Sequence, residues 1–498
     1  MDITITPEEM KALETDYMRQ TGVPGALLME HAAQGVTAAL GRHAAPSGRV
    51  LFLCGPGNNG GDGYASARLW QARGGQSVIA EMSSAPWGDA GMNRELARQM
   101  GIPLHPLRDA AAQLDGCDAV CDALFGTGLD RAIEGEAAAI IAQVNAAGRS
   151  VIAVDIPSGL HGKTGHPTGP VIRATETVTF HRMKQGLLLG ESADWAGQIA
   201  VQPILMPAAW GNVPGLRCMT PADLPALLPP RRPGAHKGTY GKAVLLVGSY
   251  GMAGAAALCA RACVKAGAGL VYVLCPAAVL PVVQVLVPGA VCAALPERDG
   301  EIAPEAAEVA SAWLHGATCG AIGCGLGQSK ALLPILAAFR AAACPVIWDA
   351  DALNLLAAST DLLPLPAHHV ITPHPGEAAR LLRASVPAVE ADRLAALRHL
   401  HARCGCGVLL KGARTLMTNG KVTAVNRFGS PAMAKGGSGD ILTGLLCGLC
   451  CQRQDADMLE NMQMATLLHG LAGIRAAARY GERGVLPEQL IEELQVKG

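Results

Sequence analysis

The sequence predicts an α/β protein of two domains, the first built on a doubly wound parallel sheet. Short apolar runs alternate with helical stretches, as in parallel sheets covered by helices. Glycine-rich turns follow several of these runs, and a length of 498 residues favours two or more domains. Half of the residues are apolar, only 3% are aromatic and 60 are glycine. We therefore expect cores of small aliphatic side chains that let helices pack closely on the sheets.

The first half begins with a helix and continues with four strands. Thr6 can cap a helix that starts at Pro7, and Glu9 completes a capping box. Residues 49–54 (RVLFLC) form a buried strand, and further strands begin at Ser77, Asp118 and Ser150, with helical stretches between them. In such sheets ligands bind beyond the carboxyl ends of the strands.

A proline-rich segment separates the two halves. Eight prolines lie between residues 203 and 233, so neither a helix nor a strand persists there. We place the boundary near residue 215 and predict domains 1–215 and 216–498. A second sheet starts at Lys242. Its other strands are expected within residues 269–275, 320–325, 345–351, 368–374 and 407–412, and helices follow at 441–450 and from about Asn461.

Charge and cysteine content exclude several classes of protein. The net charge is −1, so no basic field is available to bind nucleic acid or an anionic membrane. The 16 cysteines are scattered and lack zinc-type spacing, which indicates reduced, mostly buried thiols. The first residues, MDITITPEEM, contain no apolar signal core, so a cytoplasmic enzyme is expected.

Three strand ends in the first half carry polar groups that a doubly wound sheet would bring to one edge. They are the GPGNNGGDG turn, Asp122 in DALFGTGL and Asp155 in VDIPSGL. The glycines can present backbone amides to a pyrophosphate. The Asn59 amide, the Asp122 carboxylate and the Ser158 hydroxyl are hard oxygen donors that suit an alkali or alkaline-earth cation rather than zinc.

These motifs, with the segment FHRMKQGL, resemble the NAD(P)H-hydrate epimerase family over about the first 210 residues. The resemblance implies a Rossmann-like fold that binds potassium through Asn59, Asp122 and Ser158. It implies that Asp155 moves a proton and that Lys184 gives electrostatic help, unless Lys184 is a solvated surface lysine. The cofactor contacts that it implies are Asn58, Asn59, Gly60, Gly61, Asp62, Gly126, Thr127, Gly128, Leu129, Asp130, Arg131, Ala132 and Asp155.

The densest signal of the second half is AKGGSGD, directly before a predicted helix. Its glycines expose amides that can form an anion hole, and Asp440 can take a proton from a hydroxyl that attacks phosphorus. Lys411 follows a strand and opens a turn suited to nucleotide phosphates, although it could be a surface lysine. His374 stands between two prolines in TPHPGE, where a structural role is the alternative.

Together with GSYGMAGAAAL, GCGLG and DADALN, these motifs resemble the NAD(P)H-hydrate dehydratase family from about residue 220 onwards. The resemblance implies a ribokinase-like α/β domain that phosphorylates a C6 hydroxyl and then eliminates phosphate, with ADP expected rather than ATP, and Mg²⁺. The implied substrate contacts are Ala255, Ala256, Gly325, His374 and Asp440. The implied nucleotide contacts are Lys411, Gly412, Ala413, Arg414, Thr415 and Gly439.

Two alternatives remain open at this point. One is a ribokinase-like vitamin or sugar kinase with an N-terminal nucleotide-binding appendage. The other is a dinucleotide-binding module without catalysis, against which the carboxylates at the strand ends argue. Under the favoured interpretation the small-molecule substrates are NADHX, NADPHX and an adenine nucleotide, and a homo-oligomer is expected.

Overall fold

The computed structural model describes residues 1–82, 86–211, 213–298 and 301–497, and these form two compact units. The first unit is Ile3–Leu216, and the second is Met1–Asp2 with Arg217–Gly498. The chain crosses between the units within the short strand β1 (Asp2–Ile3) and again after Leu216.

A seven-stranded parallel sheet forms the centre of the first unit, in the order β4-β3-β2-β5-β6-β7-β8. Counted from β2, this begins with the Rossmann order 3-2-1-4-5-6. Its strands are β2 (Arg49–Cys54), β3 (Gln76–Glu81), β4 (Leu104–Pro106), β5 (Ala119–Ala123), β6 (Ser150–Val154), β7 (Glu176–Phe180) and β8 (Gln198–Gln202).

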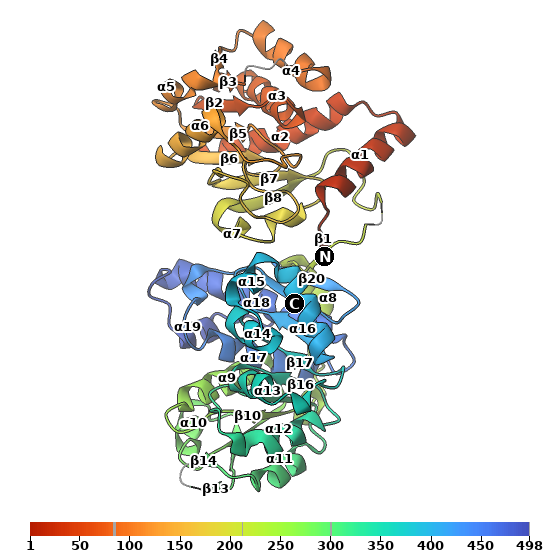
Figure 1. Ribbon diagram of the computed structural model, residues 1–498, viewed down its shortest axis with the longest axis vertical. Helices are drawn as coiled ribbons and strands as arrows, with labels where there is room; N and C mark the ends of the chain where they lie inside the picture. The colour runs from red at the N-terminus through yellow and green to blue at the C-terminus, as the bar shows by residue number, and fades with distance from the viewer. Residues whose placement is uncertain (83–85, 212, 299–300, 498) are drawn as a thin grey trace. The chain divides into compact units, whose positions relative to one another are not determined.

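Helices cover both faces of this sheet, as Figure 1 shows. Along β2, Val50 and Phe52 share a core with α1, α2 and α3, whereas Leu51 and Leu53 share the opposite core with α5 and α6. This alternation follows from the two-residue period of a strand. The helices are α1 (Pro7–Thr21), α2 (Gly25–His43), α3 (Asn58–Ala72), α4 (Gly88–Gln99), α5 (Ala110–Leu114), α6 (Gly135–Ala146) and α7 (Ser192–Trp195).

The predicted start of α1 is confirmed. The Thr6 hydroxyl accepts a hydrogen bond from the Glu9 amide, and the Glu9 carboxylate accepts one from the Thr6 amide. This reciprocal pair satisfies two donors that the helix itself leaves free.

The second unit is built on a larger mixed sheet, in which β12-β11-β10-β15-β16-β17-β18 are parallel and β19 and β20 are added antiparallel. Strand β10 begins at Lys242, as the sequence predicted, and β15 begins one residue before its predicted range, whereas the β19–β20 hairpin was missed. The strands are β9 (Arg217–Cys218), β10 (Lys242–Leu246), β11 (Leu270–Cys275), β12 (Val291–Ala294), β15 (Cys319–Ile322), β16 (Val346–Trp348), β17 (Val370–Ile371), β18 (Gly407–Leu410), β19 (Thr415–Thr418) and β20 (Thr423–Asn426), with a separate hairpin β13 (Glu297–Arg298) and β14 (Glu301–Ile302).

The helices of this unit pack tightly because small residues line their contacts. A Cβ on Gly444 of α17 would lie 2.0 Å from the carbonyl oxygen of Cys259 in α9, so only glycine allows this approach. The helices are α8 (Leu224–Leu227), α9 (Ala253–Ala266), α10 (Leu280–Leu286), α11 (Ala306–Leu314), α12 (Leu333–Arg340), α13 (Ala350–Ala358), α14 (Pro375–Leu382), α15 (Val386–Ala391), α16 (Arg393–Cys404), α17 (Ser438–Gln452), α18 (Met458–Tyr480) and α19 (Pro487–Glu492).

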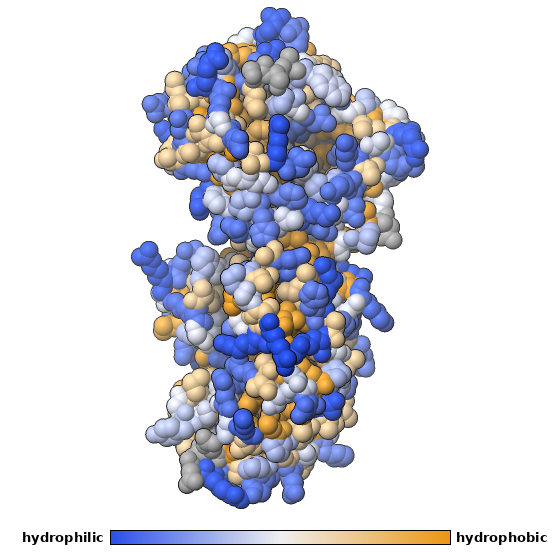
Figure 2. All heavy atoms as spheres, in the orientation of Figure 1, coloured by the Kyte–Doolittle hydropathy of each residue, from blue (hydrophilic) through white to orange (hydrophobic). Residues whose placement is uncertain are grey.

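All 16 cysteines are free thiols, and every one except the half-buried Cys292 is buried, as the sequence predicted. Hydrophilic and hydrophobic residues are interspersed on the face of both units shown in Figure 2. Among the described helices, none combines the length and the apolar character needed to cross a bilayer.

Candidate active sites

The first candidate site lies at the carboxyl ends of β2, β5 and β6, where the strand order reverses. The turn after β2 leads directly into α3, so the first amides of this helix face the edge of the sheet. A Cβ on Gly60 would lie 1.9 Å from the Gly55 carbonyl oxygen, which explains the need for glycine there. The predicted convergence of three strand ends at one edge is confirmed by the contacts that follow.

A buried oxygen cluster joins the ends of β5 and β6. The Ser158 hydroxyl donates to Asp122 Oδ1 at 2.6 Å, and the Ser158 amide donates to Oδ2 at 2.8 Å. Both side chains are fully buried. Asn59 belongs to the same corner, because its Oδ1 would lie 3.1 Å from a Cβ placed on Gly126.

This cluster fits a hard cation. Burial raises the pKa of Asp122 to about 6, although the Ser158 hydrogen bonds oppose the rise. Within the described residues, no lysine or arginine pairs with this carboxylate, and the buried Nδ2 of Asn59 has no hydrogen-bond partner. Carbonyl, hydroxyl and carboxylate oxygens around an uncompensated negative charge are the donor set that an alkali cation prefers.

A salt bridge lies beside the oxygen cluster. Lys184 Nζ is 2.6 Å from Asp155 Oδ1, which also accepts a hydrogen bond of 2.8 Å from the Thr179 hydroxyl. The Lys184 side chain is only 2% exposed and donates to the Phe180 carbonyl, so the alternative of a solvated surface lysine is wrong.

Asp155 holds this position in an unusual backbone conformation. Its φ of 64° lies in the left-handed region, which residues other than glycine seldom adopt. Conformations of this kind persist where the surrounding structure holds them, and they gather at functional sites.

Two further carboxyl groups lie near Asp155 and Lys184, and one of them was not predicted. Desolvation, together with the nearby charges of Asp155 and Glu14, raises the pKa of Asp62 well above its ordinary value. Desolvation also raises the pKa of Glu14. Glu14 comes from α1, far from the sheet in sequence, and no motif marks it. Asp62, Glu14 and Asp155 thus form a group of interacting carboxyl groups around Lys184.

The segment from Gly126 to Ala132 runs between β5 and α6. Its first residues are half-buried, and Arg131 and Ala132 are exposed. The Leu129 amide donates to the Gly126 carbonyl, which closes a turn beside Asn59. The Asn58–Asp62 stretch forms the first turn of α3 rather than a free loop.

The second candidate site lies at the carboxyl ends of β15, β16 and β18 and the start of α17. Gly437, with a φ of 92°, precedes α17, and Asp440 lies in the first turn of that helix. Desolvation and the neighbouring Asp349 raise the pKa of Asp440 to about 6, while hydrogen bonding from Cys324 and the charge of Lys411 act in the opposite direction.

Asp349 organises the groups around Asp440. It follows β16, is 1% exposed, and accepts hydrogen bonds from Lys411 Nζ at 2.7 Å and from the Thr443 hydroxyl at 2.8 Å. The surface-lysine alternative for Lys411 is therefore wrong. Lys411 also lies 3.8 Å from Glu377 Oε2, and both carboxylates raise its pKa against the effect of burial. The sequence drew attention to Lys411 and Asp440 but gave no role to Asp349.

The predicted substrate contacts lie around Asp349 and Asp440 and differ in how exposed they are. His374 caps α14, its Nδ1 accepting from the Gly376 amide, and half of its side chain is exposed. Ala255 approaches Gly325, whereas Ala256 is fully buried beneath Gly248.

The predicted nucleotide turn connects β18 to β19. A Cβ on Gly412 would meet the Arg393 guanidinium, which in turn donates to the Lys411 carbonyl. Arg414 donates to the Arg427 carbonyl, and the Thr415 hydroxyl donates to the Gly412 carbonyl. Gly439 lies beside Lys411, since its Cβ would be 3.4 Å from Nζ.

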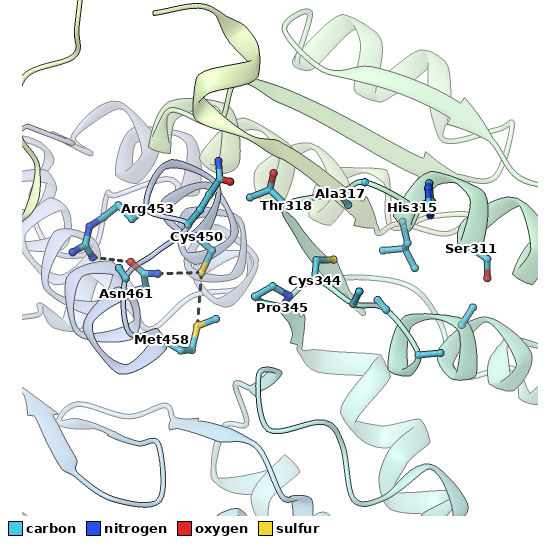
Figure 3. Close-up of a pocket in the computed structure, with 18 residues that line it drawn as sticks. Ser311, His315, Ala317, Thr318, Cys344, Pro345, Cys450, Arg453, Met458 and Asn461 are labelled. Carbon is cyan, nitrogen blue, oxygen red and sulfur yellow. Dashed lines mark hydrogen bonds between the residues drawn. The ribbon is translucent and has the colours of Figure 1, made fainter.

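A cavity of about 750 Å³ opens at the other edge of the second sheet. Figure 3 shows it beside Thr318 and Pro345, which precede β15 and β16, with Arg453 bonded to Asn461 across from them. Strand β15 separates this cavity from Cys324 and Asp440, a span of roughly 13 Å for four residues. The cavity is therefore not part of the second candidate site.

Each unit thus places acid–base side chains and helix-start amides at the carboxyl edge of its own sheet. Together the two units define a two-domain α/β enzyme, one half Rossmann-like and the other ribokinase-like. Residues 25–186 match the family described as YjeF-related protein N-terminus, and residues 243–496 match NAD(P)H-hydrate dehydratase.

Similar proteins agree with this class. The bifunctional NAD(P)H-hydrate repair enzyme Nnr of Moorella thermoacetica is 36% identical over 98% of this chain and 95% of its own length. The Escherichia coli enzyme of that name is 37% identical over 91% of this chain and 86% of its own. A ribokinase-like superfamily protein of Enterococcus faecalis V583 superposes with a TM-score of 0.50 and 26% identity, covering 57% of this chain and 96% of that one. The chain belongs to the family of bifunctional NAD(P)H-hydrate repair enzymes, which combine an epimerase and a dehydratase domain.

Proposed function

We propose that residues 1–215 interconvert the 6R and 6S forms of NADHX and NADPHX, and that residues 216–498 dehydrate the 6S form to NAD(P)H with consumption of ADP or ATP. The observation that carries the proposal is the pair of separate acid–base groups, Asp155 with Lys184 and Asp440 with Lys411, each beside helix-start amides. The rival vitamin or sugar kinase has no use for the first group.

In the epimerase half, the C–O bond at C6 must break and reform on the other face of the ring. Asp155 is the group that we assign to proton movement, because it is fixed by Lys184 and Thr179 and still 14% exposed. Lys184 neutralises its charge and fixes its direction. The Asn58–Asp62 turn and the Gly126–Ala132 loop are the proposed contacts of the dinucleotide.

We further propose that Asn59, Asp122 and Ser158 hold a potassium ion. Their buried oxygens, and an Asp122 carboxylate without a cationic partner in the described chain, fit such an ion. When bound, potassium supplies positive charge that neutralises the Asp122 carboxylate.

In the dehydratase half, Asp440 takes the proton of the C6 hydroxyl while that oxygen attacks the terminal phosphorus of the nucleotide. Amides at the start of α17 stabilise the charge on the transferred phosphoryl group. Loss of the phosphate from C6, with a proton from the ring, restores the dihydropyridine. We assign substrate contacts to Ala255, Gly325 and His374, with the fully buried Ala256 supporting Ala255 from beneath, and nucleotide contacts to Gly439 and the Lys411–Thr415 turn, with Mg²⁺ accompanying the nucleotide.

The test is recovery of the NADH absorbance band from NADHX in the presence of ADP or ATP, with and without potassium. We expect recovery with ADP, complete consumption of mixed epimers by the wild-type chain, and a residue of unreacted 6R form with Asp155→Asn, apart from slow spontaneous epimerisation. Asp440→Asn should abolish recovery and leave epimerisation intact. Net phosphorylation of a stable alcohol without recovery of NADH would support the rival kinase.

A further inference from the structure

Cys324 occupies a place in the second site that the proposed reaction does not yet use. It lies in the GCGLG turn after β15 and is fully buried. Its sulfur lies 4.0 Å from Asp349 Oδ2, and the ligand atoms of Cys324, Asp349 and Asp440 all lie within 4.8 Å of one another. A thiol thus stands between the buried carboxylate and the proposed base.

The two carboxylates differ in the donors that they already have. Asp349 accepts from Lys411 on one oxygen and from Thr443 on the other. The Cys324 thiol makes a long contact of 4.0 Å with Asp349 Oδ2, and its sulfur also lies within 4.8 Å of the Asp440 carboxylate. In the described part of the chain, no hydroxyl, amide or ammonium donor lies within hydrogen-bond distance of Asp440, so the single S–H of Cys324 is the donor that can turn toward it. Asp349 has a hydrogen-bond donor on each oxygen without the thiol, whereas Asp440 has none, so a hydrogen bond from the thiol matters more to the Asp440 carboxylate.

Cys324 remains a thiol, which lets it act as a donor. Its contact with Cys259 of α9 and its burial raise its pKa well above the ordinary value for cysteine, and Asp440 and Asp349 add to the rise. A thiolate at this position would repel both carboxylates. The same features argue against a nucleophilic or redox role, because reactive cysteines are exposed thiolates.

We infer that Cys324 is a positioning residue of the dehydratase site, whose S–H group donates to the ionised Asp440 carboxylate and aims it at the substrate hydroxyl. This inference rests on the proposed role of Asp440 as the base. The thiol touches neither substrate nor nucleotide and takes no proton. Its effect is to favour the ionised carboxylate at a place where the Asp349 charge opposes ionisation.

Asp440 also lies among charged groups from several other elements. Asp349 after β16 and Asp351 of α13 favour its protonated form, whereas Lys411 after β18 favours the ionised form. Glu377 of α14 lies behind Lys411. None of these groups changes in a Cys324 variant, so the contribution of the thiol can be measured alone.

The experiment compares Cys324→Ala and Cys324→Ser in the full-length chain. kcat/KM for dehydration of NADHX is measured across the acid range, where activity falls as Asp440 becomes protonated. Removing a donor to the charged form raises the pKa of a carboxyl, so the acid limb of Cys324→Ala should move to higher pH by about half a unit. Cys324→Ser keeps a donor and should return the limb to its wild-type position or below.

A matched control separates this effect from general loss of core packing. Cys404→Ala removes a buried thiol of α16 outside the site and should leave the acid limb unmoved. Equal shifts in the alanine and serine variants, or a loss of rate that is uniform across pH, would overturn the inference. Epimerisation by the same preparations reports whether the chain is intact.

Two further measurements keep the outcome decisive. If Cys324→Ala does not fold, the S–H infrared band of Cys324 is measured instead in the wild-type chain across the acid range. The band is identified by its loss in Cys324→Ser. A band whose frequency stays the same while Asp440 becomes protonated overturns the inference. Asp440→Asn is assayed in parallel. Retained dehydration in that variant would refute the role of Asp440, whereas an inactive variant with an unmoved limb in Cys324→Ala refutes only the role of the thiol.

Discussion

Replacing Lys184 by methionine should destabilise the first unit by about 3 kcal/mol. Methionine keeps the buried stem of the side chain but removes the ammonium that lies 2.6 Å from Asp155 and 3.1 Å from the Phe180 carbonyl. Losing one partner of a buried ion pair costs about 3–5 kcal/mol, because the other charge stays behind without compensation. Asp155 is 14% exposed, so some water reaches it and the lower end of that range applies.

The assay must report on one unit of a chain that contains two. Hydrogen exchange of peptides from β6 and β7, followed by mass spectrometry, measures the opening free energy of this unit directly. A loss of about 3 kcal/mol should speed exchange of their slowest amides by roughly a hundredfold. Epimerisation should also slow, since the Asp155 carboxylate loses the group that fixes its direction. Lys163→Met, at an exposed lysine, is the matched control and should change neither quantity.

A double-mutant cycle gives the result that could refute this reasoning. Asp155→Asn and Lys184→Met are measured separately and together, and side chains in direct contact should show a coupling of about 1–3 kcal/mol. If the two losses simply add, the pair does not stabilise the unit and the argument from burial is wrong.

Three other predictions concern the base, the cation cluster and the helix contact. Asp440 must be ionised to act as the base, and its pKa is about 6. We therefore expect kcat/KM for dehydration to be level above neutral pH and to fall about tenfold per pH unit below the pKa. A kcat/KM that is still level near about pH 5 would contradict this. Potassium should raise the melting temperature of the wild-type chain more than sodium does, and Asp122→Ala should lose that difference, since a ligand stabilises only a state that binds it. Gly444→Ala should cost about 1–3 kcal/mol in urea unfolding because the new Cβ would meet the Cys259 carbonyl, whereas Gly254→Ala, which meets open space, should not.

Local signals account for the parts of the fold that were predicted. The strand at Arg49–Cys54 is a continuous apolar run, and the start of α1 carries both members of a capping box. Asp122 and Ser158 could be brought together in advance, because parallel strands place their carboxyl ends at one edge. These inferences need only neighbours in sequence and a rule of topology.

Other features depend on distant pairings that leave no local trace. Glu14 lies on an ordinary amphipathic helix, and only the packing of α1 brings it to Asp155. Asp349 and Lys411 are far apart in sequence, and nothing in DADALN indicates that its first aspartate would accept the lysine. The hairpin β19–β20 was missed because its strands are four residues each, too short for a clear alternation.

The left-handed backbone at Asp155 narrows the choice of amino acid at that position. Only glycine, asparagine and aspartate adopt such a conformation at low cost, and of these three only aspartate can accept and release a proton. A glutamate, chemically the closest relative, would carry a longer arm on a backbone that disfavours it. Every replacement of Asp155 should therefore lose something. Glycine and asparagine keep the backbone conformation but cannot carry the proton, whereas glutamate can carry the proton but disfavours the conformation.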